Sequence, residues 1–159
     1  MATPEERLAE LGITLPAPPA AVAAYVPTVS TGHPGHACNH IYVSGQIPMV
    51  DGKVTVTGRV GAEIDTAAGA EAARTCAINV IAQLKAAIGD LDQVIRVVKL
   101  TGYVACEPGF GEQPEVVNGA STLFVDVFGD AGRHARAAVG VAALPRNVPV
   151  EVEAIVQVR

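Results

Sequence analysis

The C-terminal stretch VPVEVEAIVQV, residues 148–158, constrains the fold more than any other part of the chain. Valine or alanine occupies every even position, whereas Glu151, Glu153 and Gln157 fall at odd positions. Successive side chains of a β-strand point to opposite faces, so this period of two predicts a strand with one apolar face. The chain therefore needs a sheet, and other elements that cover one side of it.

Two segments carry the three- and four-residue spacing of helices packed on such a sheet. Residues 63–89 predict a long helix that ends at Gly89, and a second helix is expected from about Pro114. The first apolar stripe comprises Ala77, Val80, Ile81, Leu84 and Ile88. The second comprises Val117, Leu123 or Ser121, Phe124 and Phe128. A short helix is also expected at residues 4–12.

The remaining runs are β-branched, which predicts strands. These runs are residues 25–31, 40–48, 52–61, 93–105, 135–144 and 148–158. The first two and the last two are each expected to form an antiparallel hairpin. The order βββαβαββ predicts a two-layer α+β domain, a mixed sheet with two helices packed on one face. Residues 25–159 are expected to be one domain, preceded by a helix and a Pro/Ala-rich connector at 1–24. The bare second sheet face favours homo-oligomerisation.

Composition excludes several classes of protein. The 159 residues carry a net charge of −5, and no two Lys or Arg residues are adjacent, which disfavours nucleic-acid binding. No apolar run reaches the ~20 residues that span a bilayer, and the N-terminus does not resemble a signal peptide. Cys38, Cys76 and Cys106 form no CxxC pattern, which favours a reducing cytoplasm.

Arg136 is the strongest candidate for chemistry, because it interrupts a run of small apolar residues in a predicted strand. Antiparallel pairing across the turn LPRNVP is expected to bring Arg136 close to Glu151. A guanidinium beside a carboxylate makes an anion receptor with an acid/base group next to it. The alternative is a structural ion pair of Arg136 with Glu151 or Glu153, and the pattern alone does not choose between them.

Three weaker candidates each have an ordinary structural interpretation. Ser44 in VSGQIP is a small hydroxyl at a strand end, and it lies outside any GxSxG nucleophile pattern. Tyr25 at a strand start is typical of a packed tyrosine with a solvated hydroxyl. Asn118 within a helix is typical of a solvated face.

Taken in order, these residues resemble the RidA/YjgF family of reactive-intermediate deaminases, also called endoribonuclease L-PSP. The resemblance runs from Tyr25 through Ser44 of SGQIP, Asn118 of VVN and Arg136 of ARAAV to Glu151 of LPRNVPVEVEAI. It covers nearly the whole chain from Tyr25 onward. The segment 108–145 resembles a branch distinct from the best-known deaminases.

The resemblance implies a chorismate-mutase-like fold and a homotrimer with clefts between subunits. It also implies a hydrolase that converts small 2-imino or enamine acids to 2-oxo acids and ammonia, without cofactor or metal. Arg136 would bind the substrate carboxylate and Glu151 would position or activate water. Tyr25 and Ser44 would line the pocket, and Asn118 would come from a neighbouring subunit.

The sequence departs from the deaminases of this family at two places that bear on the expected activity. Ala138 occupies a substrate-side position where many deaminases have a cysteine, and the spacing from Asn118 to Arg136 is slightly longer. Two other functions therefore remain open. One is a non-catalytic trimeric module that binds small ligands or acts as a chaperone, and the other is a hydrolase of a related imine or amide in a catabolic pathway.

The segment HPGHACNH, residues 33–40, contains three histidines and one cysteine that suit a metal by type. Against the family, residues 33–38 are an insertion at a hairpin tip, where chains tolerate extra residues. No functional metal site is expected there, and the insertion would instead alter a trimer edge or the rim of a cleft.

Overall fold

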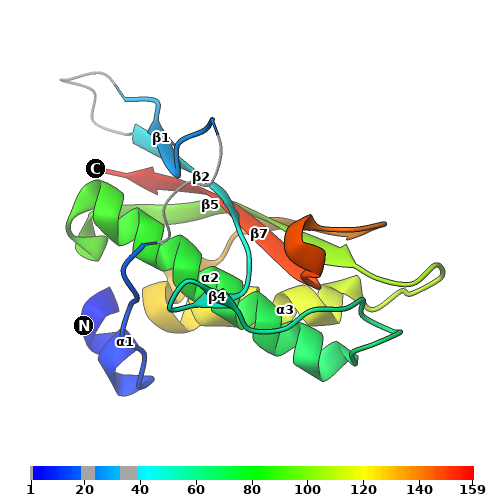
Figure 1. The fold of residues 1–159 in the computed structure, drawn as a ribbon. Coiled ribbons are helices and arrows are strands. Elements are labelled where there is room, and N and C mark those ends of the chain that lie inside the picture. The colour runs from blue at the N-terminus through cyan, green and yellow to red at the C-terminus, as the bar shows by residue number, and fades with distance from the viewer. Residues whose placement is uncertain (1, 19–23, 33–38) are drawn as a thin grey trace.

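The computed structural model describes residues 2–18, 24–32 and 39–159. Five strands form one mixed sheet in the order β1-β2-β7-β5-β6 (Figure 1). The strands are β1 (Thr28–Ser30), β2 (Asn39–Gln46), β5 (Val94–Ala105), β6 (Ala135–Val141) and β7 (Val150–Val158). β5 and β6 run parallel, whereas the other neighbours are antiparallel.

The helices begin and end at sequence signals for caps. In α1 (Pro4–Glu10), Thr3 and Glu6 form a reciprocal capping box. α2 (Thr66–Ile88) starts at Asp65, whose side chain accepts from the backbone of Ala68, and it ends at Gly89, with φ of 77°. α3 (Gln113–Phe128) has a proline in its first turn. All three predicted helices are confirmed, with α2 starting three residues later than expected.

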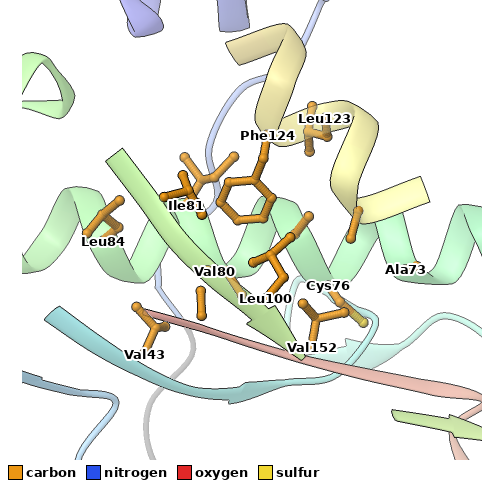
Figure 2. Packing of buried hydrophobic residues seen from close by; sticks show 14 of the residues in the cluster. Val43, Ala73, Cys76, Val80, Ile81, Leu84, Leu100, Leu123, Phe124 and Val152 are labelled. Carbon is orange, nitrogen blue, oxygen red and sulfur yellow. The ribbon is translucent and has the colours of Figure 1, made fainter. Parts of the chain in front are cut away.

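Helices α2 and α3 cover one face of the sheet, and the core lies between the two layers (Figures 1 and 2). Leu100 of β5 and Phe124 of α3 point toward Ile81 of α2 in this core, and all three are fully buried. In β7 the even positions are buried and the odd positions are half-buried, as the alternation predicted. The expected α+β class with its helices on one face is confirmed.

The third predicted strand, at 52–61, is wrong beyond its first residues. Only β3 (Met49–Val50) and β4 (Lys53–Val54) pair there, as a separate two-stranded sheet. The following segment contains Gly58 and Gly61, with φ of 113° and 87°. Positive φ is incompatible with an extended strand, so the chain turns at both glycines.

The predicted hairpin of the last two strands is also wrong. β5 lies between β6 and β7, so β6 is an edge strand that does not pair with β7. β5, α3 and β6 instead form a β–α–β unit, in which the helix carries the chain back to start a parallel strand. A short turn in the sequence therefore did not mean that the flanking strands are neighbours.

Close backbone contact between α2 and α3 depends on a glycine. A Cβ atom placed on Gly119 would lie 1.9 Å from the backbone oxygen of Ala70 in α2. We predict that Gly119→Ala lowers the free energy of unfolding by about 1–3 kcal/mol, because the helices must move apart. Chemical denaturation measures this change. Gly111→Ala is the control, since nothing lies within 4 Å of a Cβ there, and an equal loss in both variants would contradict the prediction.

Candidate functional site

Arg136 lies on the helix-facing side of the edge strand β6. It is paired with Leu100 of β5, whose side chain is in the core, and directly opposed residues share a face of the sheet. Its Nη1 atom donates to Asn118 Oδ1 at 2.7 Å and to Ser121 Oγ at 3.1 Å, both on α3. We refer to these three residues and His134 as the Arg136 cluster.

No carboxylate pairs with this guanidinium among the residues that the structure describes. The structural ion pair with Glu151 or Glu153, which the sequence left open, is therefore not formed within the chain. Nη1 donates both of its hydrogens to neutral oxygens, whereas Nε and Nη2 have no protein acceptor in the described part of the chain. A guanidinium held in this way presents two parallel donors, the geometry that binds a carboxylate.

Asn118 contacts Arg136 of its own chain. The expectation that Asn118 approaches this site from a neighbouring subunit is corrected, because Asn118 and Arg136 belong to the same subunit. Its two neighbours in α3 fix its place. Val117 packs where a Cβ on Gly102 of β5 would lie, 2.4 Å away, and Gly119 contacts Ala70 of α2. Asn118 is thereby presented to β6 and is not merely part of a solvated face.

Ser121 and His134 complete the cluster, and the sequence analysis did not assign them a role. His134 Nε2 lies 3.0 Å from Ser121 Oγ, and Nδ1 lies 2.6 Å from the carbonyl oxygen of Gly132. The signal was present in their spacing. Asn118 and Ser121 are three residues apart on a helix, and His134 immediately precedes β6, two residues before Arg136.

Glu151 projects from the other face of the sheet, where it is half-buried and opposite Tyr103 of β5. Burial raises the pKa of the Glu151 carboxyl, and the negative charge of Glu153 raises it further. Glu153 in turn accepts a hydrogen bond from Tyr103 Oη at 3.1 Å. A carboxylate with a raised pKa is a better general base near neutral pH.

The absence of a side chain at Gly45 leaves room for the Glu151 carboxylate. A Cβ on Gly45 would lie 1.9 Å from Glu151 Oε1, so this carboxylate lies directly over the glycine. The preceding residue, Ser44, donates from Oγ to the carbonyl oxygen of Val26 at 2.8 Å. That bond holds the segment containing Tyr25, whose side chain is exposed. We refer to Glu151, Gly45 and the adjoining Ser44 as the Glu151 cluster, to which Tyr25 is linked through the bond from Ser44 to Val26.

The two clusters lie on opposite faces of one chain, which corrects the expected proximity of Arg136 and Glu151. The two strands are separated by β5, and their positions are three residues apart along the sheet. With strands about 4.8 Å apart and a rise of about 3.3 Å per residue, the Cα atoms are roughly 14 Å apart. Neither side chain reaches the other within the chain.

Ala138, the remaining predicted site residue, lies two positions after Arg136 on the same face of β6. It is paired with Gly102 and packs against the edge of the core. It therefore belongs with the Arg136 cluster and not with Glu151.

Other kinds of site receive little support. The histidine-rich segment 33–38 lies outside the described residues, so the predicted insertion stays a prediction. Within the described ranges, no group of three or more His, Cys, Asp or Glu side chains is arranged to hold a metal. In those same ranges no helix is both long enough and apolar enough to cross a membrane. A hollow lined by residues 61–66 and 109–112 contains none of the candidate residues.

The fold and the Arg136 cluster define an α+β protein whose sheet edge carries a guanidinium that pairs with no carboxylate among the described residues. The chain belongs to the family described as "YjgF/chorismate mutase-like, putative endoribonuclease", whose model matches residues 5–156. The expected RidA/YjgF membership is thereby confirmed. Among curated proteins, it is similar to protein TCP17 of Trypanosoma cruzi, with 48% identity over 94% of this chain and 91% of that protein.

Two solved structures illustrate the range of similarity. Protein Atu1372 of Agrobacterium tumefaciens is 52% identical, with a TM-score of 0.89, over 98% of this chain and 92% of that one. TdcF of Escherichia coli, solved with bound serine, is 27% identical, with a TM-score of 0.63, over 90% of this chain and 94% of that one.

Glu151 gives the site a measurable effect on stability. Because its pKa is raised in the folded chain, the folded state binds this proton more tightly than the unfolded state does. The resulting destabilisation is absent below the unfolded-state pKa, about 4.3, and is complete above the folded-state pKa. We predict that Glu151→Gln raises the melting temperature at neutral pH and that its advantage disappears toward pH 4.

Thermal unfolding across this pH range tests the prediction. Glu71→Gln, at an exposed position of α2, serves as the control and should leave the curve unchanged. A Glu151→Gln variant that is less stable than the wild type at neutral pH would contradict it.

Proposed function

We propose that this protein hydrolyses small 2-imino or enamine acids to 2-oxo acids and ammonia, without a cofactor, in a cleft between subunits. The observation that carries the proposal is the half-buried Arg136 guanidinium. It is held along one edge by neutral oxygens and has no carboxylate partner among the described residues. A cation kept in that state is suited to an anionic ligand that arrives from solution.

In the proposed reaction, the substrate carboxylate binds Nε and Nη2 of Arg136. Glu151 takes a proton from a water molecule as the water oxygen bonds to the imine carbon, and the carbon–nitrogen double bond becomes single. The proton then passes from Glu151 to nitrogen, which gives a carbon bearing one hydroxyl and one amino group. Glu151 next takes the hydroxyl proton and passes it to the amino nitrogen, so that the carbonyl forms as the carbon–nitrogen bond breaks and ammonia leaves. An imine is already electrophilic, so orientation and a placed base supply most of the catalysis.

A cleft that uses both clusters requires a second copy of the chain, because one chain places them on opposite faces. The open face of the sheet supports such an assembly. Val29 and Tyr42 are paired across β1 and β2 and are 51% and 47% exposed, and Tyr42 is opposite Ile155 of β7. Such an apolar strip favours burial against another copy. We propose the homotrimer of the family, with Arg136 and Asn118 supplied together by one subunit and Glu151 by its neighbour.

One observation favours a second candidate function. TdcF was solved with bound serine, a small carboxylate-bearing molecule, which also suits a non-catalytic ligand-binding module. Cleavage of RNA, which the family description names, fits less well with a net charge of −5 and no adjacent basic residues. A measurement of turnover distinguishes the hydrolase from the non-catalytic binding module. We also propose a cytoplasmic location, which accords with an amino-acid-derived substrate.

The direct test is the formation of pyruvate from 2-aminoacrylate, generated in situ by a serine-using lyase. We predict that the wild type accelerates pyruvate release over buffer and that Arg136→Ala raises KM by roughly 10–100-fold, since a charge-assisted contact is lost. Arg133→Ala is the matched control, because Arg133 is exposed and, within the described ranges, pairs with Asp130 alone. If the wild type gives no acceleration with several imino acids, the deaminase function is wrong.

Mixed oligomers test the shared cleft. Arg136→Ala and Glu151→Gln chains are co-expressed with different tags, the mixed assemblies are purified, and they are assayed at a substrate concentration far below KM, where each variant alone has little activity. In either mixed trimer, two of one chain with one of the other, a single cleft of the three combines an intact Arg136 with an intact Glu151. We therefore predict about one third of wild-type activity per cleft. A mixture as inactive as either parent would place both residues of each site in one chain.

A further inference from the structure

Ser121 and His134 form a chain of hydrogen bonds behind Arg136 that the proposed reaction does not itself use. From this arrangement we infer that both are positioning residues, which fix the guanidinium so that its free edge accepts a carboxylate. The inference rests on the proposed function for its biological meaning. Its physical content, the orientation of Arg136, is independent of whether imines are turned over.

The direction of each hydrogen bond follows from the partner at the end of the chain. The carbonyl oxygen of Gly132 only accepts, and at 2.6 Å from His134 Nδ1 it requires the ring proton to be on Nδ1. In the neutral ring Nε2 is then an acceptor, and it takes the hydroxyl proton of Ser121 across 3.0 Å. The lone pairs of Ser121 Oγ are thereby left for Arg136 Nη1, 3.1 Å away.

The surroundings keep His134 neutral and in place. Burial lowers the pKa of the His134 ring and outweighs the raising effect of the hydrogen bond to the Gly132 carbonyl, and the charge of Arg136 lowers the pKa a little further. The ring also packs edge-on against Phe124, with centroids 6.2 Å apart and planes at 70°. A protonated ring would turn Nε2 into a donor, and Ser121 Oγ would then accept from both His134 and Arg136, with its own proton no longer held by the ring.

Asn118 alone cannot fix the guanidinium. One hydrogen bond to Nη1 allows the planar group to swing about that contact, whereas two bonds to the same nitrogen define its plane. Ser121 is the second of these bonds, and His134 decides which way the Ser121 hydroxyl points. The spacing in the sequence suits this role, because Ser121 follows Asn118 by about one helical turn and His134 lies just before β6, two residues ahead of Arg136.

The decisive experiment measures binding separately from turnover, with pyruvate as a carboxylate probe followed by NMR titration of the intact protein. We expect Ser121→Ala to weaken pyruvate binding roughly tenfold and to raise the KM for imine hydrolysis with little change in kcat. Ser121→Thr, which keeps the hydroxyl, should restore both values. Thr122→Ala, at the exposed neighbouring position, should match the wild type.

Nitrogen NMR of His134 reports the protonation state and tautomer of the ring. A purely structural role of His134 would not require one particular tautomer. A neutral ring with the proton on Nδ1 at pH 7 is expected, and an imidazolium or the Nε2–H form would overturn the inference. It is also overturned if folded Ser121→Ala keeps the wild-type affinity and KM, or if folded Ser121→Thr binds as weakly as Ser121→Ala.

These outcomes separate the inference from the proposed function. If the wild type binds pyruvate but hydrolyses no imine, and Ser121→Ala weakens that binding, the proposed function fails and the positioning role stands. If the wild type hydrolyses imines and Ser121→Ala is unchanged in affinity and KM, the function stands and the positioning role fails. If the wild type binds no pyruvate and hydrolyses no imine, both are wrong.

Discussion

The docking of α3 is the constraint on which the rest of the structure depends, and three consecutive residues set it. Val117 occupies the space that a side chain on Gly102 would need, and Gly119 meets the backbone of Ala70. Both contacts lack room for one further methyl group, so α3 has a single rotation and depth relative to β5 and α2. Asn118, between these two contacts, must then face β6. The polar groups that hold Arg136 are thus placed by the packing of their apolar neighbours.

This arrangement explains how the chain tolerates a half-buried cation without a countercharge. Withdrawing a guanidinium from water is costly unless its hydrogens find acceptors, and the Arg136 cluster supplies neutral acceptors along one edge. A carboxylate in their place would satisfy the charge and close the receptor. Asn118 and Ser121 orient the cation yet leave its charge uncompensated, which is the property that an anion-binding site requires.

The sequence predicted those features that depend on local chemistry and missed those that depend on strand order. The alternation in residues 148–158 and the cap at Gly89 follow from periodicity and backbone preference, and both are confirmed. The pairing of β6 with β7 was wrong because a turn between two strands does not reveal that β5 lies between them. Arg136 and Glu151 were recognised singly, but their opposite faces follow only from the register of β5 with both neighbours.

The separation of the two clusters also limits what the proposed cleft accepts. If Arg136 of one subunit touched Glu151 of the next directly, the two would form an ion pair, which would neutralise the receptor and lower the pKa of the base. A working cleft must hold them apart by the length of a bound substrate, with its carboxylate on the guanidinium and its imine carbon beside the carboxylate of Glu151. In a 2-imino acid these two groups are on adjacent carbons. A cleft of this kind therefore selects for the position of the imine relative to the carboxylate.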